Sequence, residues 1–258
     1  MEIETLETPP AQDVVPPAPP VPPPPRRSLA AWLQATNWVW IVAGLALLLR
    51  LVYVYQLSKT PFYYPDRLDP LFYFNWAREI AAGQWIGDKI FVQSPLYAYM
   101  VAVFLKLLGE GRLFQWGLHG FQVLAGVGTC LLMIRIARRV ASQREAFFTG
   151  LLVACYGPFL FYEGMVMKTF LSTFLTVYLV DLLLRSEGTH SRRVIAAGFV
   201  FALTSLVRDN FVLLFPLLLA GFFLACPPLS LRQKVKACAF FTLGAAPGIL
   251  PVTARNYA

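Results

Sequence analysis

The segment WVWIVAGLALLLRLVYVYQL, residues 38–57, decides the fold of this chain. It carries a single charged side chain, Arg50, with tryptophan near its beginning and tyrosine toward its end. A helix of roughly 20 apolar residues crosses a hydrocarbon core about 30 Å thick, and Trp and Tyr favour the membrane interfaces. We therefore predict a transmembrane helix here. Arg50 is expected either to reach outward to the interface or to face a polar interior.

The rest of the chain repeats this apolar pattern. Hydrophobic residues make up 57% of the sequence and charged residues only 14%, whereas a soluble domain carries about a quarter charged residues. The predicted fold class is all-α, a multi-pass transmembrane helical bundle of about seven spans. After the first span, the predicted spans are residues 114–136, 146–162, 167–184, 194–207, 211–226 and 237–254.

The positive charges indicate how the bundle is oriented. The formal net charge is +8, and the basic residues cluster in short segments between apolar runs, as at 135–144 and 185–193. Such segments stay on the cytoplasmic side. Because this rule explains the net charge, no nucleic-acid partner is expected. The apolar stretch 95–108 is too short to span, and counting it would move the later basic segments outside, so we expect a helix in the outer interface.

Two regions are predicted along the chain. Residues 1–35 are rich in proline and should form a disordered cytoplasmic tail, with recognition by a reader of proline-rich motifs as an alternative role. Residues 36–258 form the transmembrane module, in which 58–113 make a large outer loop.

The outer loop contains two helix signals. Asp69 before Pro70 is typical of an N-cap and first helical residue, and Gly83 follows at the expected end. Ser94 before Pro95 predicts a second juxtamembrane helix, which should stop at Gly109.

Ionisable side chains gather at the predicted outer ends of the spans. Carboxylates there could act as a base and cations could hold a phosphate. Each has a simpler explanation as a helix cap, a loop charge or a local ion pair. No metal site is predicted, because the two histidines, His119 and His190, fall on opposite sides of the membrane. The candidates are Asp66 and Asp69, Glu163 and Lys168, Arg208 and Asp209, which could instead form a local ion pair, and Arg255.

Several of these residues lie within longer motifs. DPLFYFNWAREIAAGQW at 69–85 is followed by SPLYAY at 94–99 and LLGE at 107–110. YGPFLFYE at 156–163 and RNY at 255–257 come later. In this order, the motifs resemble those of polytopic GT-C glycosyltransferases related to protein O-mannosyltransferases and aminoarabinose transferases. The resemblance covers roughly residues 38–258.

This resemblance implies a transferase that moves a sugar from a polyprenyl-phosphate donor to a lipid, glycan or protein on the outer face of the membrane. It assigns Asp69 as the general base, and the remaining candidates as possible contacts to donor or substrate. Gln93 stands where relatives often carry a lysine, so one expected phosphate contact is replaced. No cofactor is predicted beyond the lipid-linked donor.

Relatives usually continue through further spans and an outer domain, so the chain is expected to be the N-terminal part of such an enzyme and to be inactive alone. The expected location is the inner membrane of a bacterium, or the endoplasmic reticulum of a eukaryote, with a cytoplasmic N-terminus. Two alternatives stay open. One is a lipid-linked-sugar transporter or flippase, and the other is a non-catalytic scaffold that acts through the proline-rich tail.

Overall fold

The computed structural model of the chain describes residue 33 and residues 37–65, 68–86, 91, 93–186, 191–224 and 229–257. The predicted tail, apart from Leu33, lies outside these residues, as do Asp66 and His190. Within the described ranges the protein is entirely helical. The helices are α2 (Trp38–Leu57), α3 (Leu68–Ala81), α4 (Leu96–Leu108), α5 (Arg112–Val140), α6 (Gln143–Cys155), α7 (Gly157–Gly164), α8 (Thr169–Ser186), α9 (Ser191–Val207), α10 (Phe215–Leu224) and α11 (Leu231–Tyr257), with short 3-10 helices η1 (Pro61–Tyr63) and η2 (Asp209–Leu214).

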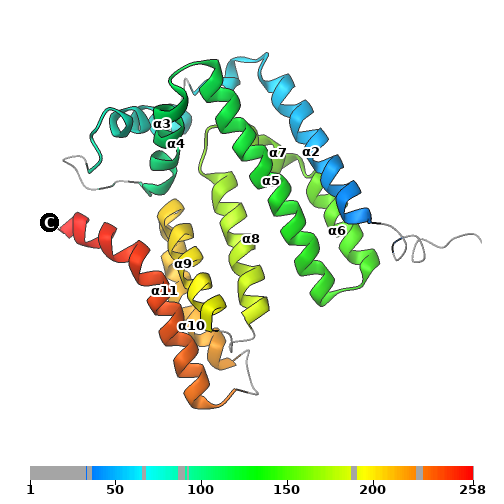
Figure 1. Ribbon diagram of the computed structural model, residues 1–258, viewed down its shortest axis with the longest axis vertical. Helices are drawn as coiled ribbons and strands as arrows, with labels where there is room; N and C mark the ends of the chain where they lie inside the picture. Colours follow the sequence, from blue (N-terminus) through cyan, green and yellow to red (C-terminus); the bar gives the residue numbers. More distant parts are fainter. Residues whose placement is uncertain are drawn as a thin grey trace, which may run out of the picture.

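The helices form two packed groups joined through α5. Helices α2, α5, α6 and α7 lie on one side of the molecule, and α8, α9, α10 and α11 lie on the other (Figure 1). Helix α5 packs against both α6 and α8. Helices α3 and α4 form a hairpin at one end of the bundle, beside the end of α11 (Figure 1). We call this the α3–α4 end.

The membrane character of the bundle is confirmed. Helices α2, α5, α8 and α11 are long and apolar enough to cross a bilayer, and α6 with α7 makes a fifth span if the bent pair counts as one. In α2, for example, Ile41, Leu48 and Leu51 are at least half exposed, as lipid-facing side chains must be. The remaining two predicted spans correspond to the shorter α9 and α10, so the count of seven stays a prediction.

The predicted span at 146–162 is bent rather than straight. The axes of α6 and α7 differ by 44°, and the break falls at Tyr156, whose backbone is extended. Pro158 explains the break locally, because it has no N–H to continue the helical hydrogen-bond pattern and its ring crowds the preceding turn. The bend carries the end of α7 into the interior of the bundle.

Both loop helices are present, with small shifts at their starts. Helix α3 begins at Leu68, so Asp69 lies in its first turn rather than at the cap, and Gly83 follows the end at φ 108°. Helix α4 has Pro95, not Ser94, at its N-cap, and it ends at Gly109 with φ 68°. Both glycines adopt left-handed backbone that other residues avoid, which is why the helices stop there.

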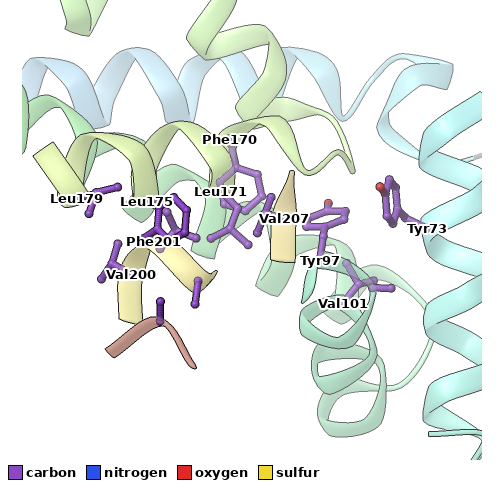
Figure 2. Close-up of a cluster of buried hydrophobic side chains, with 14 of the residues drawn as sticks. Tyr73, Tyr97, Val101, Phe170, Leu171, Leu175, Leu179, Val200, Phe201 and Val207 are labelled. Atoms are coloured by element: carbon purple, nitrogen blue, oxygen red, sulfur yellow. The ribbon is translucent and has the colours of Figure 1, made fainter. Parts of the chain in front are cut away.

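The hairpin is anchored to the bundle by its apolar face. Figure 2 shows Tyr97 and Val101 of α4 next to Phe170 and Leu171 of α8 and Val207 of α9. Tyr97 is fully buried and meets the ring of Phe170 edge-on at 6.1 Å. Tyr73 of α3 lies at the margin of this cluster, 5.1 Å from the ring of Tyr97. This packing fixes the polar side chains that surround Tyr73.

Candidate functional site

Asp69 borders a largely apolar cavity at the α3–α4 end. The cavity has a volume of about 640 Å³, and Asp69 is its only carboxylate among the described lining residues. Leu68, the preceding residue, has a φ of 51°, a strained value for a side chain of its size. This backbone presents the exposed Asp69 carboxylate at the start of α3. The other lining residues are Pro61, Phe62, Tyr64, Leu68, Pro70, Met165 and Met167.

One turn along α3, Tyr73 connects this helix to Gln93 and Lys168. The Tyr73 hydroxyl donates a hydrogen bond to Oε1 of Gln93 at 2.6 Å, and Nζ of Lys168 donates to the same oxygen at 3.3 Å. Lys168 also lies over the Tyr73 ring, 5.6 Å from its centre. Two of the predicted candidates, Gln93 and Lys168, are therefore in contact although they lie 75 residues apart in the sequence.

The hydroxyl of Tyr73 stays protonated in this setting. Burial raises the pKa of Tyr73 well above its ordinary value, and the nearby carboxylates of Asp69 and Asp209 raise it further. A protonated Tyr73 remains a hydrogen-bond donor, so Oε1 of Gln93 is held in place at any physiological pH.

Asp209 joins the site from the beginning of η2, next to the end of α9. Its Oδ1 accepts a hydrogen bond from the hydroxyl of Ser94, which is 2% exposed. Asp209 also lines a second cavity of about 240 Å³, together with Gln93 and Ser94. The predicted local pair of Arg208 with Asp209 is not formed. Arg208 is exposed, and among the described residues its side chain has no hydrogen-bond or ion-pair partner.

Arg255 docks the end of α11 onto the segment that precedes α4. Its Nη2 donates to the carbonyl oxygen of Ile86 at 2.5 Å, and its guanidinium lies 4.0 Å from the centre of the Phe91 ring. The neighbouring Asn256 accepts a hydrogen bond from the backbone N–H of Phe91 at 3.2 Å. These contacts close one wall of the second cavity.

The sequence indicated that Glu163 lies at the outer end of a span, but its side chain is not exposed there. It lies in the last turn of α7, 5% exposed, in an ion pair with Arg50 of α2. The two contacts are 2.6 Å from Nε to Oε2 and 3.1 Å from Nη2 to Oε1. Of the two expectations for Arg50, the polar interior is confirmed, because the side chain is 1% exposed. The bend at Tyr156 brings the two charges together.

Helix α5 holds the segment that leads from α7 to Lys168. Nε2 of Gln122 donates to the carbonyl oxygens of Glu163 and Met165, both at 2.7 Å. Nε2 of His119 lies 2.9 Å from the carbonyl oxygen of Gly164. The two α5 side chains, both 0% exposed, thus fix the backbone that presents Met165, Met167 and Lys168 toward the site. His119 is an interior hydrogen-bonding residue.

Comparison with known families adds to this geometry. A family model described as dolichyl-phosphate-mannose-protein mannosyltransferase matches residues 92–254, which is more than half of the chain. The chain belongs to this mannosyltransferase family. Membership means a membrane glycosyltransferase of the GT-C type that takes its sugar from a polyprenyl-phosphate donor. No curated protein and no solved structure matched the chain.

The family match covers most of the residues that meet around Tyr73. Gln93, Lys168 and Asp209 lie inside the matched range, Arg255 lies directly after it, and Asp69 and Tyr73 lie before its start at residue 92. Among the described residues, no group of three or more His, Cys, Asp or Glu is placed to hold a metal ion. The mannosyltransferase fold thus assembles its polar groups from a carboxylate pair, amides and a lysine.

Sequence reasoning missed several members of the site. Tyr73 was quoted only as part of a motif, and Ser94 only as a helix cap. Asp209 was a candidate, but nothing in the sequence shows that η2 places its carboxylate against Ser94. The one available signal was the polar pair Gln93-Ser94 directly before an apolar helix in the outer loop.

Proposed function

We propose that this protein transfers a sugar from a polyprenyl-phosphate donor to a hydroxyl group of a lipid, glycan or protein acceptor. We further propose that transfer occurs at the α3–α4 end and that this end faces away from the cytoplasm. The family membership supports the donor class, and the position of Asp69 supports the location of the chemistry. Arg138 and Arg139 in the last turn of α5 and Arg144 in the first turn of α6 lie toward the opposite end, which supports the orientation.

Asp69 is the proposed general base. In a single displacement, the acceptor hydroxyl gives its proton to the Asp69 carboxylate while its oxygen forms a bond to the anomeric carbon of the donor sugar. The bond from that carbon to the phosphate oxygen breaks, and its electron pair leaves with the polyprenyl phosphate. Because the phosphate is already a good leaving group, a base and a phosphate-binding cation are the main requirements.

Lys168 is the proposed cation for the donor phosphate. It is half-buried at the α3–α4 end, and its only hydrogen bond to a described side chain is the one to Gln93. Gln93 therefore replaces the lysine of relatives by orienting a lysine from another segment. Arg208, exposed at the end of α9, is a second contact for the phosphate. Arg255 takes the role of closing the site through Ile86 and Phe91.

The apolar cavity beside Asp69 is the observation that carries this proposal. Asp69 lines a largely apolar cavity, and Lys168 directly follows another of its lining residues, Met167. This combination suits a substrate that is part lipid and part phosphate. Tyr64, Phe62, Met165 and Met167 provide apolar surface there, and methionine adapts to irregular chains. The polyprenyl chain or a lipid acceptor would occupy this space.

The test replaces Asp69 in the full-length enzyme, in membranes supplied with a radiolabelled polyprenyl-phosphate sugar. Asp69→Asn should lower transfer by a factor of about 100 or more, in line with loss of a general base. Glu79→Gln is the matched control, because Glu79 is an exposed carboxylate on the same helix and should be silent. Equal transfer by Asp69→Asn and wild type would remove Asp69 from the mechanism. Movement of labelled lipid across the membrane without a new glycosidic bond would instead favour a flippase.

A further inference from the structure

The second cavity at the α3–α4 end differs in character from the one beside Asp69. It lies where the start of α4, the start of η2 and the end of α11 meet, and its volume is about 240 Å³. This is somewhat below the roughly 300–1,000 Å³ of sites for drug-sized ligands, and far above the roughly 30 Å³ share of one water molecule. Its polar lining residues are Gln93, Ser94, Ser205, Asp209, Thr253 and Asn256.

Two amide side chains, those of Gln93 and Asn256, line this cavity. Oε1 of Gln93 is already occupied by Tyr73 and Lys168, and Oδ1 of Asn256 is occupied by the N–H of Phe91 and by Nη1 of Arg255 at 3.1 Å. Each amide oxygen is thus already occupied by protein donors. The NH₂ groups of Gln93 and Asn256 have no partner among the described residues, so four N–H donors remain for a ligand.

Acceptors complement these donors. Oδ1 of Asp209 takes the Ser94 hydroxyl, which leaves Oδ2 without a partner among the described residues. The hydroxyls of Ser205 and Thr253 donate to carbonyl oxygens of their own helices, both at 3.0 Å, and keep lone pairs to accept. A group that fills the cavity must therefore both accept and donate hydrogen bonds, which is the property of a hydroxyl-rich ring.

The charge in the cavity excludes a phosphate. Asp209 is the only ionisable group among the described lining residues, and its carboxylate would repel an anion. Lys168 instead lies against the opposite side of the Gln93 amide. Gln93 therefore separates a cationic position from a neutral, hydrogen-bonding one.

We propose that this cavity binds the sugar ring of the donor, as an uncharged pyranose held by Gln93, Asp209 and Asn256. The proposal rests on the proposed function for the existence of a polyprenyl-phosphate donor. It adds the division of the site: phosphate at Lys168, sugar in the cavity beyond Gln93, and lipid chain or acceptor in the apolar cavity beside Asp69. Selection among sugars then depends on hydroxyl contacts to Asp209 and Asn256, since a sugar that lacks a matching hydroxyl forms fewer hydrogen bonds in the site.

The test measures binding rather than transfer, with the full chain in lipid nanodiscs. The probes are polyprenyl-phosphate-mannose, polyprenyl-phosphate-glucose and sugar-free polyprenyl phosphate. Thr253→Phe fills the cavity from the exposed side of α11, and Asp209→Asn removes its charge without changing its shape. Thr149→Phe on α6 is the control, because Thr149 lines neither cavity and also donates to the carbonyl four residues earlier.

Wild type should bind at least one sugar-bearing lipid more tightly than the sugar-free lipid. Thr253→Phe and Asp209→Asn should each lower the affinity for that sugar-bearing lipid by about tenfold or more. The affinity of each variant for the sugar-free lipid should stay within about twofold of wild type. Thr149→Phe should match wild type throughout. Equal binding of all three lipids by wild type, or equal weakening of all three by the cavity variants, would overturn the proposal.

The outcome is independent of whether the enzyme transfers. If wild type distinguishes the lipids but Asp69→Asn has no effect on transfer, the sugar cavity stands and the proposed base fails. If Asp69→Asn abolishes transfer but the cavity variants bind every lipid like wild type, the base stands and the sugar cavity fails.

Discussion

Glu163 and Glu110 each pair with an arginine at 2.6 Å, but in very different surroundings. The Arg50 and Glu163 side chains are 1% and 7% exposed, whereas those of Arg78 and Glu110 are both 52% exposed. Gly126 of α5 lies directly against the buried pair, and a Cβ there would overlap both Glu163 and Arg50. The chain therefore reserves space for two charges in the interior of the bundle, where leaving one unpaired is costly.

This contrast gives a prediction at the scale of single residues. Glu163→Gln should destabilise the fold by about 3–5 kcal/mol, because it leaves the Arg50 charge buried without a counter-ion. Glu110→Gln should cost no more than about 1 kcal/mol, as exposed pairs do. Reversible unfolding in mixed micelles measures both. Equal losses for the two variants would mean that burial of the Arg50–Glu163 pair does not determine its contribution.

At the residue scale, sequence alone predicted the candidates but not all their partners. Gln93 and Lys168 were both expected at the outer face, and they are in contact. Arg50 and Glu163 were identified separately, but their pairing depends on the bend between α6 and α7, which no local pattern announces. Asp181 was not singled out, although it is 0% exposed and its carboxylate contacts Arg135 at 2.6 Å.

At the scale of elements, α9 and α11 make the closest helix contact. Gly198 of α9 lies against the backbone of Phe241, and Gly244 of α11 lies against the backbone of Ile195. Small residues let membrane helices approach in this way, and packing rather than the hydrophobic effect then holds them together. The contact positions the end of α9, which leads to Asp209, beside the end of α11, which carries Asn256.

Gly244→Ala should therefore be damaging. The added methyl group would overlap the carbonyl of Ile195, a backbone atom that cannot rotate away, and overpacking costs about 1–3 kcal/mol. Gly221→Ala in α10 is the matched control, because nothing lies within 4 Å of the position of its Cβ and alanine favours a helix. Thermal unfolding in detergent compares the two. If the Gly244→Ala protein were as stable as the Gly221→Ala protein, the close contact between α9 and α11 would not contribute to the stability of the fold.

Helix existence was largely predictable, and helix continuity was not. Apolar runs and the Gly83 and Gly109 stops correctly predicted α3, α4 and the long helices. The break at Tyr156 was missed because the apolar run continues through Pro158 without a polar interruption. The change from 3-10 to α-helix at Phe215 was missed for the same reason.

At the scale of the whole molecule, the chain alternates in direction through α2, α5, α6, α8, α9, α10 and α11, and the α3–α4 hairpin caps one end (Figure 1). A cysteine in place of Gln84 at the α3–α4 end should react with an impermeant thiol reagent added to intact cells. One in place of Arg144, between α5 and α6, should react only after the membrane is opened. Both positions are exposed, so the side of the membrane from which the reagent reaches them decides the result. The native cysteines Cys130, Cys155, Cys226 and Cys238 are replaced beforehand. Labelling of the Arg144 position in intact cells would reverse the orientation and move the proposed site to the cytoplasm.

The contacts of Arg255 with Ile86 and of Asn256 with Phe91 span 169 and 165 residues of sequence. During synthesis, the α3–α4 hairpin therefore enters the membrane long before the segment that docks on it has been translated. At about 5–20 residues per second, the delay is roughly ten to thirty seconds. The nascent chain passes that interval with the α3–α4 hairpin undocked, so the proposed site cannot be assembled until α11 has left the ribosome and inserted.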